Sequence, residues 1–211
     1  MTVWLITAGM IFAACPAAAA DTALSLPDLL ARAQQGDAAA QRQLGMAYQN
    51  GDGVQRDYEQ AVDWYTKAAR QGDALAQKQL ASMYKHGNGV RRDYRRAASW
   101  YTKAAEQGRA DAQYFLGLLY TEGKGVERDY TLAVHWLTLS ATQGYGAAQY
   151  LLGELYFSGH GAAQDYPQAY LWFAVNALDG GTEAAHNRDL AAAKLSPEAL
   201  AQAQQAAAAL A

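Results

Sequence analysis

The residues of this chain that could do chemistry are few, and the most suggestive pair is Ser82 and Lys85. Their S-x-x-K spacing places a hydroxyl and an amine on one face of a helix, as in serine enzymes that recognise β-lactams. Neither S-D-N nor K-T-G accompanies the pair, and nothing in the sequence activates the hydroxyl. A β-lactam-recognising hydrolase using Ser82 is therefore an alternative, to be tested with a chromogenic β-lactam on wild type and Ser82→Ala.

Metal and nucleotide sites are not expected either. The histidines are scattered along the chain rather than clustered as metal ligands: His86, His135, His160 and His186. Gly-x-Gly segments such as Gly51 to Gly53 lack the Lys-Ser/Thr that follows in a phosphate-binding loop. We expect no catalytic residue, no metal and no cofactor.

The elements that position these residues follow a repeat of 36 residues. Identical residues recur at this offset in several columns, and such a period is typical of solenoid proteins. The clearest columns are Trp64, Trp100, Trp136 and Trp172; Leu44, Leu80, Leu116 and Leu152; Tyr48, Tyr84, Tyr120 and Tyr156.

Each unit predicts two helices joined by a glycine turn. In the first unit, the apolar residues of 40–48 have helical spacing, and Gly51 accepts the left-handed conformation that ends a helix. Asp57 then caps a second helix that begins at Tyr58. The middle of the first helix always has Gly or Ala, so a neighbouring helix is expected to pass close by. The indoles of the Trp column are expected in the core.

Four such hairpins cannot bury their own apolar faces and must stack. The expected units are 37–72, 73–108, 109–144 and 145–180, preceded by a capping helix within 21–36. A degenerate unit and a last capping helix follow in 181–211. Arg188 and Asp189 give this unit a polar outer face, and Ser196 and Pro197 begin the last helix.

These units resemble the Sel-one-like repeat (SLR) family, relatives of tetratricopeptide repeats, with the pattern A-x-x-x-L-G-x-x-Y-x-x-G-x-G-V-x-x-D-Y-x-x-A-x-x-W-x-x-x-A-A-x-x-G. The second unit reads AQKQLASMYKHGNGVRRDYRRAASWYTKAAEQG. The resemblance implies an all-α fold, a right-handed α/α superhelical solenoid. It also implies a non-enzymatic adaptor or regulator that acts through protein contacts.

By analogy with related superhelices, a protein or peptide partner is expected in a concave groove lined by the first helix of each unit. An acidic part of the partner would face Lys78 and Lys85, and an apolar side chain would lie near Tyr150. A cell-wall glycan binder using Tyr114 and Tyr150 is the other alternative. The groove positions are Arg42, Met46, Lys78, Ser82, Lys85, His86, Tyr114, Leu118, Glu122, Tyr150, Glu154 and Phe157.

Two further features concern surface charge and exposed aromatic residues. Tyr114, Tyr150 and Phe157 are expected to be exposed and to have no purpose other than binding. Four arginines near residues 91–96 are interpreted as a solvated loop and helix start. With 17 basic and 20 acidic residues and a net charge of −3, the chain is not expected to bind nucleic acid.

The first residues predict export. An uncharged apolar run from Val3 to Ala14 and the small residues before Asp21 indicate a signal peptide over 1–20, cleaved after Ala20. A lipoprotein acylated at Cys15 is the competing interpretation. The run is too short to span a bilayer, so no integral membrane segment is expected after cleavage. We expect a periplasmic or secreted protein, with association to the cell envelope left open.

Overall fold

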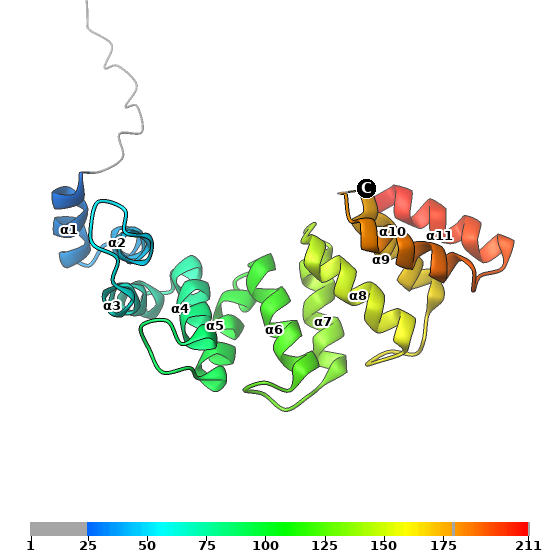
Figure 1. The fold of residues 1–211 in the computed structure, drawn as a ribbon, viewed down its shortest axis with the longest axis horizontal. Coiled ribbons are helices and arrows are strands. Elements are labelled where there is room, and N and C mark those ends of the chain that lie inside the picture. Colours follow the sequence, from blue (N-terminus) through cyan, green and yellow to red (C-terminus); the bar gives the residue numbers. More distant parts are fainter. Residues whose placement is uncertain (1–24, 179, 211) are drawn as a thin grey trace, which may run out of the picture.

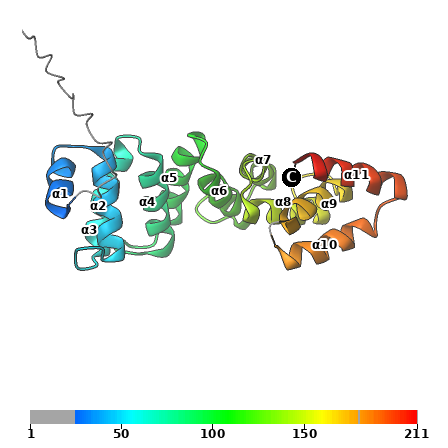
Figure 2. The same ribbon diagram turned by 90° about the horizontal axis from the view of Figure 1, so that it is seen from above.

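The computed structural model describes residues 25–178 and 180–210, and these residues form eleven helices with no strand. The predicted signal peptide, its cleavage after Ala20 and Cys15 lie outside the described residues. Figure 1 shows the helices following one another along an arch that is open at the top. Figure 2 shows the same array from above as an extended row rather than a closed bundle. The expected α/α solenoid is confirmed.

Each of the four units consists of a first helix, here called helix A, and a second, helix B. The A helices are α2 (Ala38–Asn50), α4 (Ala74–His86), α6 (Ala110–Glu122) and α8 (Gly146–Ser158). The B helices are α3 (Tyr58–Arg70), α5 (Tyr94–Glu106), α7 (Tyr130–Ala141) and α9 (Tyr166–Leu178). Helix α1 (Leu26–Gln34) precedes the array, and α10 (Thr182–Ala192) and α11 (Pro197–Leu210) follow it.

The predicted helix boundaries are confirmed by their hydrogen bonds. Gly51 ends α2 in the left-handed conformation, with φ +86°. The Asp57 carboxylate accepts hydrogen bonds from Glu59 N and Gln60 N at 2.9 and 3.1 Å and so caps α3. The Asp57 amide donates to the Tyr48 carbonyl at 2.9 Å, which closes the loop between the two helices. Asp93, Asp129 and Asp165 close and cap the later units in the same way.

Close packing within a hairpin explains the small residues in the middle of the A helices. A Cβ added at Gly45 would lie 2.8 Å from Cδ1 of Tyr65, and one at Gly117 would lie 2.8 Å from Cγ of Leu137. A large side chain of helix B therefore occupies the space above each small residue. The side chains at this position of helix B are fully buried: Tyr65, Tyr101, Leu137 and Phe173.

The expectation that the whole Trp column lies in the core is only partly correct. Trp64 and Trp172 are buried, but Trp100 and Trp136 are half-buried. Trp100 packs against two apolar clusters, one shared by α3 and α4 and one shared by α4, α5 and α6, so its indole spans a boundary between units. Its other face is covered by the Lys103 ammonium, 4.3 Å from the ring centroid. The deepest position is the next residue of helix B.

The second glycine of each loop makes a contact between units. A Cβ on Gly125, with φ +75°, would overlap the carbonyl group of Tyr94 at the start of α5. Gly89 and Gly161 approach the first residue of the preceding helix B in the same way. Among the described residues, nothing lies within 4 Å of a Cβ added at Gly53, which follows the first A helix and therefore has no earlier helix B to meet. Stacking therefore requires glycine here for two reasons, backbone conformation and space.

A ladder of buried glutamines also joins the units. Gln41 Nε2 donates to the Ala33 carbonyl at 3.0 Å, and Gln41 Oε1 accepts from Gln71 Nε2 at 2.7 Å. Gln77 Nε2 donates to the Ala69 carbonyl of the first unit at 3.1 Å, and Gln113 Nε2 donates to the Ala105 carbonyl of the second unit at 3.2 Å. Within their own units, Gln77 and Gln113 accept from Gln107 and Gln143, each pair at 2.8 Å. Because an unsatisfied buried amide destabilises the fold, these bonds fix the register of one unit on the next.

The C-terminal helices pack against the fourth unit. Arg188 is half-buried and Asp189 is exposed on α10, so the outer face of this unit is polar. The Ser196 hydroxyl accepts from Ala199 N at 3.2 Å at the start of α11. Ala191 and Ala203 lie in the same apolar cluster as Phe173 of the fourth unit.

Candidate functional site

The predicted groove residues lie on one side of the A helices, here called the A-helix face. In the first unit, helix α2 lies above α3 in Figure 1, on the side toward which the arch opens. None of the twelve residues is buried. Four are exposed, namely Met46, His86, Glu122 and Glu154, and eight are half-buried, namely Arg42, Lys78, Ser82, Lys85, Tyr114, Leu118, Tyr150 and Phe157.

One repeat position of this face, occupied by Arg42 in the first unit and Lys78 in the second, links each unit to the next. Arg42 Nε lies 3.0 Å from Asp73 Oδ2, which is the N-cap residue of α4. Lys78 Nζ lies 3.6 Å from Asp111 Oδ2 in the following unit. Both cations therefore hold neighbouring A helices together and are not free groups of the groove.

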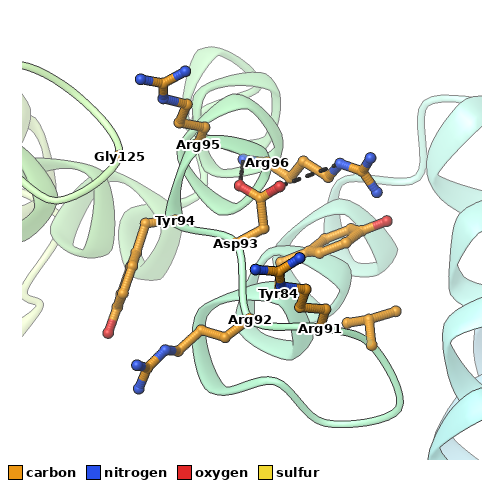
Figure 3. A pocket seen from close by; sticks show the side chains of 9 residues that line it. Tyr84, Arg91, Arg92, Asp93, Tyr94, Arg95, Arg96 and Gly125 are labelled. Atoms are coloured by element: carbon orange, nitrogen blue, oxygen red, sulfur yellow. Dashed lines mark hydrogen bonds and ion pairs between the residues drawn. The ribbon is translucent and has the colours of Figure 1, made fainter.

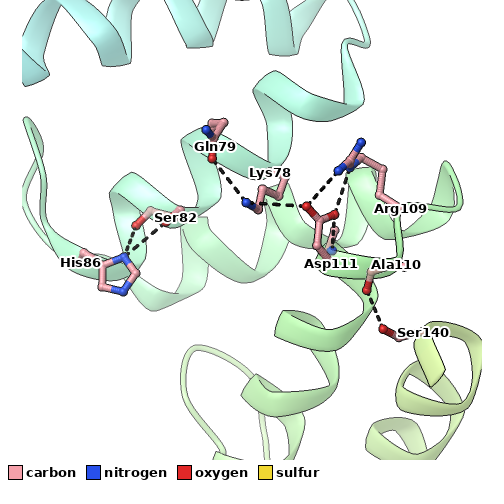
Figure 4. Close-up of polar contacts among 9 residues, drawn as sticks. Lys78, Gln79, Ser82, His86, Arg109, Ala110, Asp111 and Ser140 are labelled. Carbon is pink, nitrogen blue, oxygen red and sulfur yellow. Dashed lines mark hydrogen bonds and ion pairs between the residues drawn. The ribbon is translucent and has the colours of Figure 1, made fainter. Parts of the chain in front are cut away.

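A second cation, Arg109, shares the carboxylate that pairs with Lys78. Its guanidinium contacts the Asp111 carboxylate through two hydrogen bonds of 3.0 and 2.9 Å (Figure 4). Burial raises the pKa of the Asp111 carboxyl, but the hydrogen bond from Arg109 and the charges of Arg109 and Lys78 outweigh it, so the pKa lies below its usual value. One carboxylate thus serves two cations, and sequence reasoning missed both Arg109 and Asp111.

The arrangement around Ser82 does not favour nucleophilic catalysis. His86 Nδ1 lies 2.8 Å from the Ser82 carbonyl oxygen and 3.3 Å from its hydroxyl (Figure 4). A carbonyl oxygen only accepts, so the shorter contact requires a proton on Nδ1 and leaves that nitrogen no lone pair for the hydroxyl proton. Among the described residues, no hydrogen bond joins Ser82 to Lys85. The S-x-x-K pair is therefore not assembled as a nucleophile and its base.

Lys85 is directed toward an aromatic surface instead. Its Nζ lies 4.5 Å from the ring centroid of Phe115 in the next unit. Burial lowers the pKa of the Lys85 ammonium, and the charge of Glu122 acts in the opposite direction. Phe115 also stacks on the buried Tyr101 ring at 5.2 Å. The Lys85 ammonium thus lies between the core of the solenoid and the A-helix face.

The expectation that three groove aromatics are exposed and unused by the fold is wrong. Tyr114 packs on Tyr145 with 5.2 Å between ring centroids, and Phe157 packs on Tyr166 at 5.4 Å. The Tyr150 hydroxyl accepts a hydrogen bond of 3.1 Å from Asn187. Tyr114 and Tyr150 occupy the repeat position that Arg42 holds in the first unit, and this position faces the next unit. Their rings therefore pack into the boundary between units.

An apolar pocket opens at the C-terminal end of the A-helix face. Its cavity measures about 320 Å³ and is lined by Glu154, Phe157, Ser158, Phe173, Asn187 and Leu190. Leu190 is 45% exposed at its rim. Partial burial raises the pKa of the Glu154 carboxyl, and the nearby charge of Glu183 adds to this effect. The sequence predicted Glu154 and Phe157 but missed Asn187 and Leu190, which belong to the degenerate fifth unit.

The described part of the chain has neither a metal-binding cluster nor a membrane-spanning helix. There, no three residues among His, Cys, Asp and Glu come together as metal ligands. Over the same residues, no helix is long and apolar enough to cross a membrane.

Comparisons with known proteins agree with this architecture. The Sel1 repeat model matches residues 38–73, 74–108, 110–145 and 146–174. The structure of a protective antigen from uropathogenic Escherichia coli with an SLR fold is 37% identical, with a TM-score of 0.79, and the match covers 87% of this chain and 40% of that one. A Sel1 repeat protein from Oxalobacter formigenes is also 37% identical, with a TM-score of 0.68 and coverage of 71% and 62%.

The chain thus spans less than two thirds of the length of either structure. A comparison with the curated proteins gives no match.

Proposed function

We propose, on the premise that this chain belongs to the Sel1 repeat family, that it is an exported scaffold or adaptor. Its partner is a peptide or protein segment bound on the A-helix face. Sel1 repeat proteins generally mediate protein–protein interactions, and their scaffold is typically non-catalytic. The proposal adds a location for the protein, a face and the chemistry of the segment that binds there.

The observation that carries the proposal is the apolar pocket at Phe157 and Leu190. A cavity of about 320 Å³ can hold one large apolar side chain. Two polar side chains at its rim, Glu154 and Asn187, can bind backbone amide and carbonyl groups of the same segment. An apolar anchor surrounded by polar groups is typical of the strongest points of protein interfaces.

The two lysines of the second unit, Lys78 and Lys85, determine the direction in which the segment would bind along the A-helix face. Lys85 is a better contact for an acidic residue than Lys78, because Lys78 already pairs with Asp111. The Lys85 ammonium is partly desolvated beside Phe115, so a carboxylate there forms a stronger ion pair than at an exposed lysine. The acidic end of the segment would therefore lie near the second unit and its apolar end near the fourth.

Photocrosslinking in the native host tests the bound face. A photoreactive amino acid at Leu118 or Glu154 should capture the same partner, because both positions lie on the A-helix face. The matched controls are Leu132 and Leu139, which are both 38% exposed on α7. Equal capture of that partner from the α7 positions would contradict the proposed face.

A pocket variant makes the test sharper. Leu190→Arg should abolish capture at position 154, because it places a charge at the rim of the apolar pocket. Its melting temperature should stay close to that of wild type, since the side chain is already 45% exposed. Retained capture by a folded Leu190→Arg protein would remove the pocket from the proposal.

Export is tested separately. The protein isolated from the periplasm or the medium should begin at Asp21, and N-terminal sequencing measures this directly. A chain that keeps Met1 and stays in the cytoplasm, or one acylated at Cys15, would contradict cleavage after Ala20.

A further inference from the structure

The second unit has a basic cavity that the binding face does not include. The cavity measures about 620 Å³ and lies at the loop between α4 and α5, on the lower edge of the arch in Figure 1. Four arginines line it, together with Tyr84 and Tyr94 (Figure 3). We call it the arginine cavity; its arginines are Arg91, Arg92, Arg95 and Arg96.

The charge of the arginine cavity is largely uncompensated. All four arginines are exposed, and Arg96 alone has an acidic partner within 4.0 Å among the described residues, Asp93 at 3.4 Å. Asp93 also accepts from the Arg96 amide at 3.0 Å, so its carboxylate is shared with the helix cap. Arg91 and Arg92 lie in the loop before α5, and Arg95 and Arg96 lie in its first turn. A bound anion would reduce the repulsion among these four like charges.

Two guanidinium groups lie near aromatic rings, and one of them, that of Arg96, also pairs with the Asp93 carboxylate. The Arg92 guanidinium carbon is 5.7 Å from the Tyr94 ring centroid, and that of Arg96 is 5.5 Å from the Tyr84 centroid. A guanidinium stacked on a ring is held in place while its N–H groups stay free to donate. The tyrosines thus position donors for a ligand that enters the cavity.

The scaffold itself does not require these charges. The first unit has the corresponding cavity of about 470 Å³, lined by Gln55, Arg56 and Gln60 among others. The column of Arg91 holds Gln, Glu and Ala in the other units, that of Arg95 holds Glu, Thr and Pro, and that of Arg96 holds Gln, Leu and Gln. Only Arg92 recurs, in three units. The second unit has therefore gained three cations at positions where packing permits other residues.

We propose that the arginine cavity binds an acidic peptide segment, with two or more Asp or Glu side chains supplied by a protein partner. A guanidinium can bind a carboxylate through two parallel hydrogen bonds, which suits this ligand. The proposal rests on the protein-binding role of the family, but it does not depend on the A-helix face.

The spread of the guanidinium groups favours a peptide over a compact anion. Figure 3 shows Arg95 and Arg92 pointing to opposite sides of the cavity, so their donors do not converge on one point. A single phosphate would be bound best by converging donors, whereas carboxylates spaced along a chain match the spread. A nucleic acid fits less well, because the positive charge is confined to one unit of a chain with net charge −3.

Fluorescence anisotropy with a labelled octaglutamate peptide tests the proposal. Wild type should bind this probe at 50 mM salt, and Arg91→Gln/Arg96→Gln, which gives the cavity the side chains of the first unit, should weaken binding at least tenfold. The control Arg70→Gln/Lys194→Gln removes the same charge from exposed positions outside the cavity and should leave binding within twofold. Both double variants should melt like wild type.

Three results would overturn the proposal. The first is an equal loss of binding in both double variants, which would indicate a general charge effect. The second is no binding of octaglutamate by wild type. The third is tighter binding of tripolyphosphate than of the peptide, which would indicate a phosphate site. None of them bears on crosslinking at Leu118 and Glu154, so failure here is distinguishable from failure of the proposed function.

Discussion

Replacing Gly125 by alanine, with Gly53→Ala as its control, isolates the energy of the contact between units. The two glycines occupy the same position of the loop and have similar backbone conformations, with φ +75° and +72°. Only their surroundings differ. A Cβ at Gly125 would overlap the Tyr94 carbonyl group and lie 2.7 Å from Arg95 N, whereas one at Gly53 would meet nothing within 4 Å.

The magnitude follows from these two environments. A left-handed alanine costs about 1–2 kcal/mol relative to glycine, and both variants carry this penalty. The atoms facing Gly125 are backbone and must retreat with the start of α5, which adds about 3 kcal/mol, the upper end for overpacking. We expect Gly53→Ala to lower the free energy of unfolding by about 1 kcal/mol and Gly125→Ala by about 4 kcal/mol.

Urea denaturation followed by tryptophan fluorescence and by circular dichroism at 222 nm measures this difference. For a chain of this size, 3 kcal/mol corresponds to a difference in melting temperature of roughly 6–12 °C. Gly89→Ala should behave like Gly125→Ala, because it meets the first residue of α3 in the same way. Equal destabilisation by Gly53→Ala and Gly125→Ala would refute the argument that this glycine joins the units.

Two further predictions use differences between equivalent positions and between protonation states. Tyr65→Phe should cost about 1 kcal/mol, because the hydroxyl donates to Gln49 at 2.7 Å, whereas Tyr101→Phe should be neutral or stabilising in urea melts, because its buried hydroxyl has no partner. Glu154→Gln should stabilise the protein at pH 7 but not at pH 3.5. Burial and Glu183 raise the folded pKa of Glu154 above its usual value of 4.5, so ionisation weakens the folded state. The gap in melting temperature should open as pH rises through 4.5 and then stay constant; a gap that is the same at both pH values would contradict the raised pKa.

The fold was predictable because each structural role recurs in four copies. The helix ends could be placed because glycine with positive φ and a capping aspartate have local causes, as at Gly51 and Asp57. The close approach of two helices could be predicted from small residues alone, as at Gly117. The glutamine ladder was missed although Gln41 recurs every 36 residues, because a polar column inside a helix was not considered as buried.

The candidate site was harder to predict because it depends on contacts between neighbouring units. The position of Lys78 on the face could be deduced from its column, but its pairing with Asp111 depends on a residue 33 positions later in a different column. Exposure of Tyr114 was predicted from the regular repeat, yet the ring packs on Tyr145, a residue that replaces the capping aspartate of earlier units. Where the residue type at a repeat position differs between units, the exposure of that side chain can be judged only when the residue that it contacts in the neighbouring unit is known.

The same reasoning explains how one backbone can present different surfaces. The positions that hold the units together, such as Gly125 and Gln77, admit almost no change, because each is in contact with a neighbouring unit. The positions around the arginine cavity face solvent, so side chains there change without disturbing the stack. The first two units show the consequence: one loop geometry surrounds Gln55 and Gln60 in one copy and Arg91 and Arg96 in the next. A solenoid built in this way can acquire a binding site in one unit while the stability of the array stays almost unchanged.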